Sequence, residues 1–176
     1  MSKKPFLTIR EIVLFGIFPA LITASQLLLS VLPNIHLTGM FVMLMTLLFR
    51  WKALFPLYVY VFLMGLINGF NLWWIPYLYI WTVLWAMTML IPRKIPKQWA
   101  RFVYPAVCAL HGLIYGTIYS PVHALIYHFN WEQTLIWIAN GFPFDLIHAA
   151  SNLVMGMLLL PLLRALQSFT NPQKTK

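Results

Sequence analysis

Residues 141–152, GFPFDLIHAASN, place three polar side chains at the start of a segment that is otherwise apolar as far as Leu166. At helical spacing Asp145, His148 and Asn152 share one face, because residues i, i+3 and i+7 are neighbours along a helix. Polar and ionisable side chains are costly in a membrane and face a protein interior or a wet cavity. The stretch therefore predicts a membrane helix with one functional face.

A second interpretation applies to Asp145 taken alone. This residue follows Pro143 by two positions, and Pro favours the first turn of a helix. A carboxylate in that turn would complement the helix dipole and would need no ligand. Three polar groups on one face favour the functional interpretation.

The composition predicts an integral membrane protein. The chain has 176 residues, of which 61% are hydrophobic and 9% are charged, whereas a soluble domain has about 25% charged residues. This length allows one helical bundle, so we predict a single transmembrane domain over residues 1–169 and a polar cytoplasmic tail over 170–176. Cys108 is the only cysteine, which excludes an internal disulfide and leaves the redox compartment open.

Six apolar segments are expected to cross the membrane. They span residues 9–32, 37–49, 53–70, 73–91, 102–127 and 141–166. The first begins like a signal peptide, but its apolar run is too long for a cleaved signal, and we expect an uncleaved helix. The second is shorter than the roughly 20 residues that a crossing needs, which leaves a re-entrant element as an alternative.

The charge distribution predicts the orientation of the bundle. The formal net charge is +9, and all twelve Lys and Arg residues fall at the two termini and in two short loops. Cytoplasmic loops are rich in Lys and Arg, so both termini are expected inside and the basic charge does not indicate nucleic-acid binding. The stretch 128–140, which has neither Lys nor Arg, is expected to be an outer loop.

Tracing the crossings at about 1.5 Å per residue places most polar and aromatic side chains toward the outer end. Trp and Tyr often serve only as interface anchors, but an aromatic belt does not explain amides and a carboxylate at one depth. We expect an outward-open pocket with aromatic walls and a few polar groups that orient a small ligand. The candidate substrate-binding residues are Asn68, Asn71, Trp74, Tyr77, His111, Tyr115, Trp137, Asn140, Asp145, His148 and Asn152.

Several chemistries find no support in the sequence. The chain has no GxxxxGK[ST] loop for ATP and no HExxH zinc motif, and its histidines do not have metal-site spacing. Asp145 is the only Asp, whereas an aspartyl protease needs two carboxylates, and no nucleophile is placed with Asp145 and His148. We therefore expect no catalytic residue, no bound metal and no cofactor.

Three features resemble the substrate-binding S component of energy-coupling factor (ECF) vitamin transporters. The stretch from Ala20 to Ala24, ALITA, is similar to the AxxxA motif that docks on the shared coupling subunit. Residues 33–37, PNIHL, are similar to the first loop, which caps the site, and residues 141–152 resemble the start of the sixth helix in several S components. The resemblance spans residues 8–166.

The resemblance implies a multi-pass protein of the plasma membrane that binds a vitamin or related micronutrient from outside. Its partners would be a transmembrane coupling subunit and two ATPase subunits, which alone use ATP. Ala20 and Ala24 would dock on the coupling subunit, and Gly16 continues the same stripe of small residues. The resemblance does not extend to the nickel and cobalt branch, whose members begin Met-His.

The ligand class is narrowed by charge and shape alone. Asp145 favours a ligand with a cationic or donor group, and the many Trp and Tyr residues favour a ring. Thiamine-like, pyridoxine-like or deazapurine-like molecules fit these features better than a dianion does. No signature fixes one vitamin.

Two other classes of membrane protein stay open. A small secondary carrier usually shows internal repeats or broken helices at matching positions, and the sequence has no such pairing. An accessory subunit of another complex would not need polar groups clustered at one depth. A membrane enzyme is a weaker alternative, because no nucleophile is placed beside Asp145 and His148.

Overall fold

The computed structural model describes residues 6–170, and within them every regular element is a helix. The elements are α1 Ile9–Leu28, α2 Thr38–Phe49, η1 Arg50–Ala53, α3 Leu54–Asn68, α4 Trp74–Met89, α5 Lys97–Leu113, α6 Tyr115–Tyr127, α7 Trp131–Gly156 and α8 Leu159–Thr170. The prediction of an all-α chain is confirmed. The predicted tail lies outside the described residues beyond Thr170.

Several helical stretches are long and apolar enough to cross a membrane, judged by length and composition. Within the described residues they are Ile9–Leu28, Thr38–Asn68 and Lys97–Tyr127. The pair Trp131–Gly156 and Leu159–Gln167, bent by 40°, adds a fourth if it counts as one span. By the composition of its helices, the chain is a multi-pass membrane protein.

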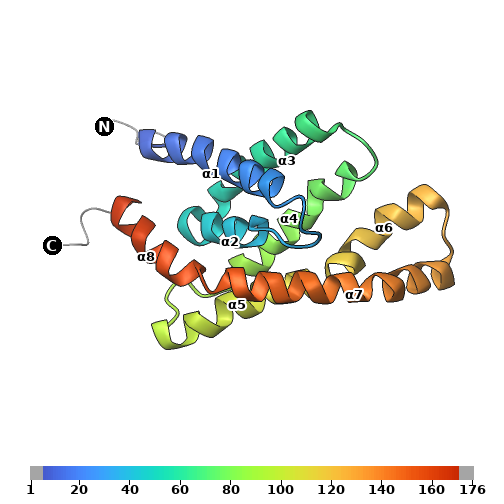
Figure 1. Ribbon diagram of the computed structural model, residues 1–176. Coiled ribbons are helices and arrows are strands. Elements are labelled where there is room, and N and C mark those ends of the chain that lie inside the picture. Colours follow the sequence, from blue (N-terminus) through green and yellow to red (C-terminus); the bar gives the residue numbers. More distant parts are fainter. Residues whose placement is uncertain (1–5, 171–176) are drawn as a thin grey trace.

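The stretch Thr38–Asn68 is contiguous in sequence but is not one straight span, because the chain reverses direction at η1. Thr38 at the start of α2 and Tyr60 in α3 both donate a hydrogen bond to Gln26 Oε1, toward the end of α1. In contrast, Lys52 in η1 forms an ion pair with Glu11 in the first turn of α1, at 2.7 Å. Because η1 and the two donors lie at opposite ends of α1, α2 and α3 form a hairpin (Figure 1).

Arg50 makes this turn and is held there by α4. Its φ of 56° is in the left-handed region, which side chains other than glycine adopt at an energetic cost. Its Nη2 donates to the Met89 carbonyl at 2.8 Å, and its own carbonyl accepts from Trp85 Nε1 at 3.1 Å. Two hydrogen bonds to one helix thus stabilise the strained residue.

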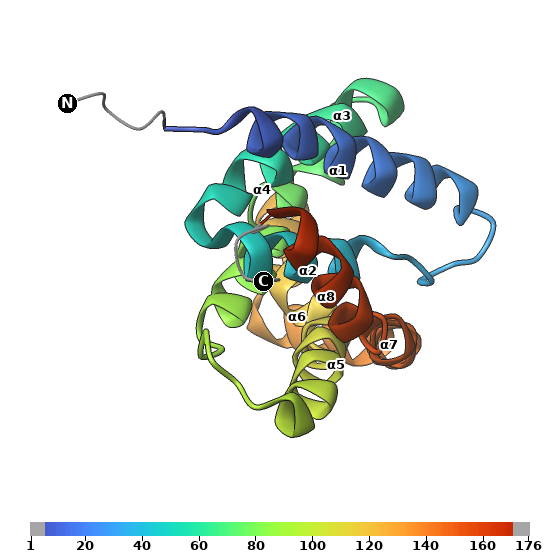
Figure 2. The same cartoon turned by 90° about the vertical axis from the view of Figure 1, so that its left-hand side faces the viewer.

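The basic residues gather at one end of the molecule. The start of α1, η1, the α4–α5 connection, the start of α5 and the end of α8 lie together (Figure 1), and Figure 2 looks onto that end. These elements carry every Lys and Arg of the described residues. We call this the basic end, and we call the opposite end, where α6 meets α7, the aromatic end.

α5 and α7 pack antiparallel at very short distance because glycines lie between them. A Cβ built on Gly112 would lie 2.8 Å from the backbone carbonyl carbon of His148. One built on Gly156 would lie 2.7 Å from Cα of Pro105. Small residues allow such close approach, and in a membrane this packing replaces the hydrophobic effect as a source of helix association.

The stretch 128–140, predicted to be an outer loop, is mostly helix. α7 begins at Trp131 and not at residue 141, because Asn130 and Gln133 form a capping box. Each side chain accepts a hydrogen bond from the backbone N–H of the other at 2.9 Å. His128, with φ of 55°, ends α6, so a short turn joins α6 to α7 in a helical hairpin (Figure 1).

Candidate ligand-binding site

Two adjoining cavities lie toward the aromatic end. The hairpin cavity, of about 350 Å³, lies between α6 and α7, and the loop cavity, of about 290 Å³, lies beneath the connection 29–37. They share Asn34, Tyr115 and His148 as a common wall. The rest of the hairpin cavity is lined by Gly116, Tyr119, His123, Trp137, Gly141, Phe144 and Asp145.

Aromatic rings form one wall of the hairpin cavity. Tyr115, Tyr119 and His123 follow each other at four-residue spacing on α6, so their side chains share one face. Trp137 on α7 stacks on Tyr119 with ring centroids 6.0 Å apart and on His123 at 4.5 Å. The wall is therefore built of stacked rings drawn from both helices of the hairpin.

Asp145 lines the same cavity and is only 4% exposed. Its two carboxylate oxygens accept from the Gly116 N–H at 3.0 and 3.2 Å. α6 begins at Tyr115, and the first N–H groups of a helix have no partner within it. The carboxylate of α7 therefore caps α6 and complements its dipole.

The cap on α6 corrects one expectation from the sequence. Asp145 does not lie at the N-terminus of its own helix, because α7 begins at Trp131 and contains Pro143 in its interior. It lies instead at the N-terminus of a neighbouring helix. A Cβ at position 116 would lie 2.6 Å from Asp145 Oδ2, so a glycine is required there for the contact.

The Asp145 carboxylate keeps capacity to bind a further donor. A carboxylate offers about four acceptor sites, and one N–H uses few of them. Neither Lys nor Arg lines the two cavities, and the described Lys and Arg residues lie at the basic end. Among the described residues Asp145 has no ion-pair partner.

The loop cavity is lined by polar groups that carry no charge. Gln26, Ser30, Asn34 and Tyr77 contribute amides and hydroxyls. Gln26 Nε2 donates to the Tyr77 hydroxyl at 3.0 Å, which links α1 to α4 at the cavity wall. Burial, together with two neighbouring histidines, lowers the pKa of His36 to about 3, so this ring is neutral at physiological pH.

Two ring nitrogens, one of His148 at the common wall and one of His36 in the loop cavity, have no hydrogen-bond partner among the described residues. The His36 and His148 rings lie with centroids 5.0 Å apart, and the Tyr115 ring lies 4.7 Å from that of His148. Within the described residues, Nδ1 of both histidines is buried and unpaired. Buried polar atoms are nearly always paired in native proteins, but both nitrogens are closed off from solvent, so a ligand or water would reach them only where the rings move.

The neighbouring His111 does not complete a metal site with them. Its Nε2 lies 3.1 Å from the Ile80 carbonyl, and its ring packs between Trp81 and Tyr115. Over residues 6–170, no three His, Cys, Asp or Glu side chains are grouped so that they could hold a metal ion.

The candidate residues from the sequence divide into two groups. Tyr77, Tyr115, Trp137, Asp145 and His148 line the cavities. The structure places the others outside the lining: Asn68, Asn71, Trp74, His111, Asn140 and Asn152. The first group comes from α4, α6 and α7, which meet only in the folded chain.

The residues outside the lining have other surroundings. Asn152 is 1% exposed, and its Nδ2 donates to the Cys108 carbonyl at 3.2 Å between α7 and α5. Trp74 Nε1 donates to the Val61 carbonyl at 2.8 Å and so links α4 to α3. Asn68, Asn71 and Asn140 are exposed.

Some lining residues were not among the candidates from the sequence. They are Gln26, Asn34, His36, Tyr119 and His123. Gln26 could have been predicted from the sequence, since it is an amide within an otherwise apolar helix. Tyr119 and His123 could also have been predicted, because they continue the four-residue spacing that begins at Tyr115. Asn34 and His36 lie in a short connection whose contacts depend on the fold.

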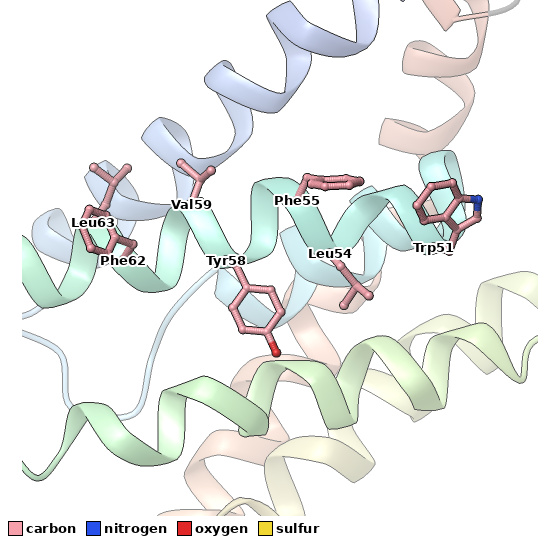
Figure 3. A pocket seen from close by; sticks show the side chains of 7 residues that line it. All are labelled: Trp51, Leu54, Phe55, Tyr58, Val59, Phe62 and Leu63. Carbon is pink, nitrogen blue, oxygen red and sulfur yellow. The ribbon is translucent and has the colours of Figure 1, made fainter. Parts of the chain in front are cut away.

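A larger cavity of about 540 Å³ lies against α3, away from these polar groups. Figure 3 shows that side chains of α3 line it, with Phe55 and Val59 toward α1 and Tyr58 toward α4. The Tyr58 hydroxyl is already bonded to the Leu78 carbonyl and to Thr82, both at 3.0 Å. This apolar groove resembles a lipid-facing surface and offers little to orient a polar ligand.

The two cavities at the aromatic end have the features of a small-molecule site. Both are concave; aromatic rings form one wall of the hairpin cavity, uncharged polar groups line the loop cavity, and two histidine nitrogens in the lining lack partners. No protein-family model, curated protein or solved structure matches the chain. The chemistry of the site is therefore inferred from its own residues.

Proposed function

We propose that the chain is the substrate-binding S component of an ECF-type importer in the plasma membrane. It would be a six-helix transmembrane bundle with both termini inside. It would capture a vitamin or related micronutrient from outside and release it inside with a coupling subunit and two ATPase subunits. The observation that carries this proposal is the pair of cavities toward the aromatic end, with unpaired His36 and His148 nitrogens in their lining.

The placement of charge supports the proposed orientation. Lys and Arg accumulate on the cytoplasmic side of membrane proteins, so the basic end would lie inside. The aromatic end would then lie outside, with Trp and Tyr at the depth where their rings are favoured. In this orientation the hairpin cavity and the loop cavity are open to substrate from the outer side.

An exposed stripe on α1 supports association with another membrane subunit. Gly16, Ala20 and Ala24 recur at four-residue spacing, and all three are exposed. A Cβ built on Gly16 would meet nothing within 4 Å, so the described part of the chain leaves this position open. Small residues at such spacing let a partner helix approach closely.

A small secondary carrier is the second candidate, because two of the spans are interrupted. The stretch Lys97–Tyr127 breaks at Ile114 between α5 and α6, and α7 bends into α8. Discontinuous helices with a helix N-terminus at the site are common in secondary transporters. A carrier of this kind would transport without ATPase subunits, which separates the two candidates.

Uptake measurements test the proposal. The chain is expressed with and without an ECF coupling subunit and its ATPases, in cells that cannot take up the labelled vitamin. We expect uptake only with the full module. Replacing both Ala20 and Ala24 by Leu should abolish uptake and leave ligand binding by the purified chain intact, whereas Ala150→Leu, on an exposed face of α7, should leave both uptake and binding intact.

Two results would contradict the proposal. Uptake by the chain alone, driven by an ion gradient, would identify a secondary carrier. Joint loss of binding and uptake in the α1 variant would mean that the stripe packs inside the protein and does not dock on a partner.

A further inference from the structure

The hairpin cavity suits a positive charge. Asp145 supplies a carboxylate without an ion-pair partner among the described residues. The rings of Tyr115, Tyr119 and Trp137 line the same space, and the faces of aromatic rings attract cations. A buried carboxylate is stabilised by a partner of opposite charge. The remaining lining groups, His123 and Phe144 among them, add no fixed positive charge.

The loop cavity suits an uncharged group. Its polar lining consists of the amides of Gln26 and Asn34, the hydroxyls of Ser30 and Tyr77, and the His36 ring. These groups offer both donors and acceptors, and none offers a fixed charge. An ionised ligand group would lose hydration there without gaining a counter-ion, whereas a neutral heteroaromatic ring would find partners at its edge.

The two cavities lie side by side. Asn34, Tyr115 and His148 line each of them, so one molecule would reach both cavities where these three side chains move aside. Their volumes, about 350 and about 290 Å³, match the lower end of the range for drug-sized ligands. The unpaired Nδ1 of His148 lies at the junction.

We infer that the ligand is a monocation in two parts. Its cationic group binds in the hairpin cavity, against Asp145 and the aromatic wall, and its neutral ring binds in the loop cavity near His36. This inference rests on the proposed function and narrows its ligand class. Two types of molecule meet this description. One is a neutral ring that carries an aminomethyl arm, and the other is a pair of linked rings of which one is cationic.

Matched pairs of probes test the charge assignment. Pyridoxamine and pyridoxine share a ring and differ in an ammonium or a hydroxyl on one arm. Thiamine and its neutral oxidation product thiochrome, in which a third ring joins the other two, provide a second pair that differs in both charge and shape, and biotin provides an anion. Binding of each probe to the full chain in detergent is measured by calorimetry, for the natural sequence and for Asp145→Asn.

Asp145→Asn is suited to this test because the amide oxygen can still accept from the Gly116 N–H, so the cap on α6 is kept. We expect at least one cationic probe to bind about tenfold more tightly than its neutral partner, and this preference to vanish in the variant. His36→Phe, which keeps a ring and removes its nitrogens, should weaken both members of a pair equally.

The outcomes separate the inference from the proposed function. Tight binding of biotin or of a neutral probe, unchanged by Asp145→Asn, would overturn the inference and leave the proposed capture of a vitamin in place. Absence of binding by every vitamin class, in a chain that unfolds cooperatively on heating, would overturn both.

Discussion

α5 and α7 pack tightly against each other toward the basic end (the closed half), whereas a cavity lies beside α7 toward the aromatic end (the open half). In the closed half, Gly112 and Gly156 bring the two backbones together, and Asn152 bonds across to α5. In the open half, α5 breaks at Ile114, and Asp145 reaches the N-terminus of α6 beside the hairpin cavity. Asp145 and Asn152 share one face of α7, yet one lines a cavity and the other connects two helices.

This difference shows that spacing along a helix does not decide what a polar side chain does. Asn152 faces a continuous helix, and a Cβ built on Gly39 of α2 would lie 3.2 Å from its Oδ1, so little space remains around the amide. Asp145 faces a break between two helices, where an N–H group lacks an intrahelical partner and a cavity begins. The neighbouring element determines whether the group is structural or available to a ligand.

The largest effect is expected from a substitution that adds a side chain between α5 and α7 where their backbones are in closest contact. Gly112→Ala places a methyl group 2.8 Å from the His148 carbonyl carbon and 2.9 Å from the Ala149 nitrogen, both of them backbone atoms that cannot move alone. We expect the free energy of unfolding in mixed micelles to fall by about 3 kcal/mol, the upper part of the range for overpacking.

Gly16→Ala is the matched control for this substitution. A methyl group there meets nothing within 4 Å. The free energy of unfolding should therefore be unchanged, or higher by up to about 1 kcal/mol because Ala has a higher helix propensity than Gly. Equal effects of the two substitutions would show that α5 and α7 are not in close contact.

Asn152→Ala should affect stability and not ligand affinity. The substitution removes a buried hydrogen bond to the Cys108 carbonyl and leaves a space between α5 and α7. We expect a loss of about 2 kcal/mol in unfolding free energy and an unchanged Kd in calorimetry well below the melting temperature. A large loss of affinity in a folded variant would place the ligand deeper than the two cavities.

Trp137→Leu should lower both ligand affinity and stability. The indole lines the hairpin cavity, where the loss of a ring contact with the ligand would cost about 1 kcal/mol, and it also stacks on Tyr119 and His123 within the fold. We expect Kd to rise by about fivefold. Trp131→Leu, at an exposed position on the same helix, is the control and should leave Kd unchanged. Equal effects would assign both residues to the membrane interface.

The last effect concerns pH. Burial and the nearby His148 and His111 lower the pKa of His36 to about 3 in the folded chain, below the ordinary value of 6.5. The unfolded chain then binds a proton more readily, so stability is complete above about pH 6.5 and falls as the pH decreases toward 3. The melting temperature should drop between pH 7 and 5, and less so in His36→Asn. An identical drop in both would assign the effect to other groups.

The lengths of the apolar segments and the positions of Lys and Arg predicted most of the helices. The start of α7 was missed because residues 128–140, which contain no Lys or Arg, were interpreted as an outer loop, although Asn130 and Gln133 carry the pattern of a capping box. The reversal at Arg50 depends on bonds to α4, which no local pattern reveals.

The site was predictable only in part. The one-face spacing of Asp145 and His148 indicated a functional face, and both line the cavities. Gln26 and His36 were not among the candidates, because their partners are distant in sequence and their positions follow from the packing of α1, α3 and α4. Asn152 could not be distinguished from Asp145 until the helix facing each of them was known.

The central claim is that a ligand binds in the cavities toward the aromatic end and not in the larger apolar groove on α3. A thermal-shift screen of the purified chain against vitamins and their precursors should give a clear hit, since a ligand at hundredfold excess over Kd stabilises by about 2.7 kcal/mol. Two variants then locate it: Gly141→Trp fills the hairpin cavity, and Val59→Trp fills the groove. We predict that the shift disappears in Gly141→Trp and persists in Val59→Trp; the opposite pattern would contradict the account.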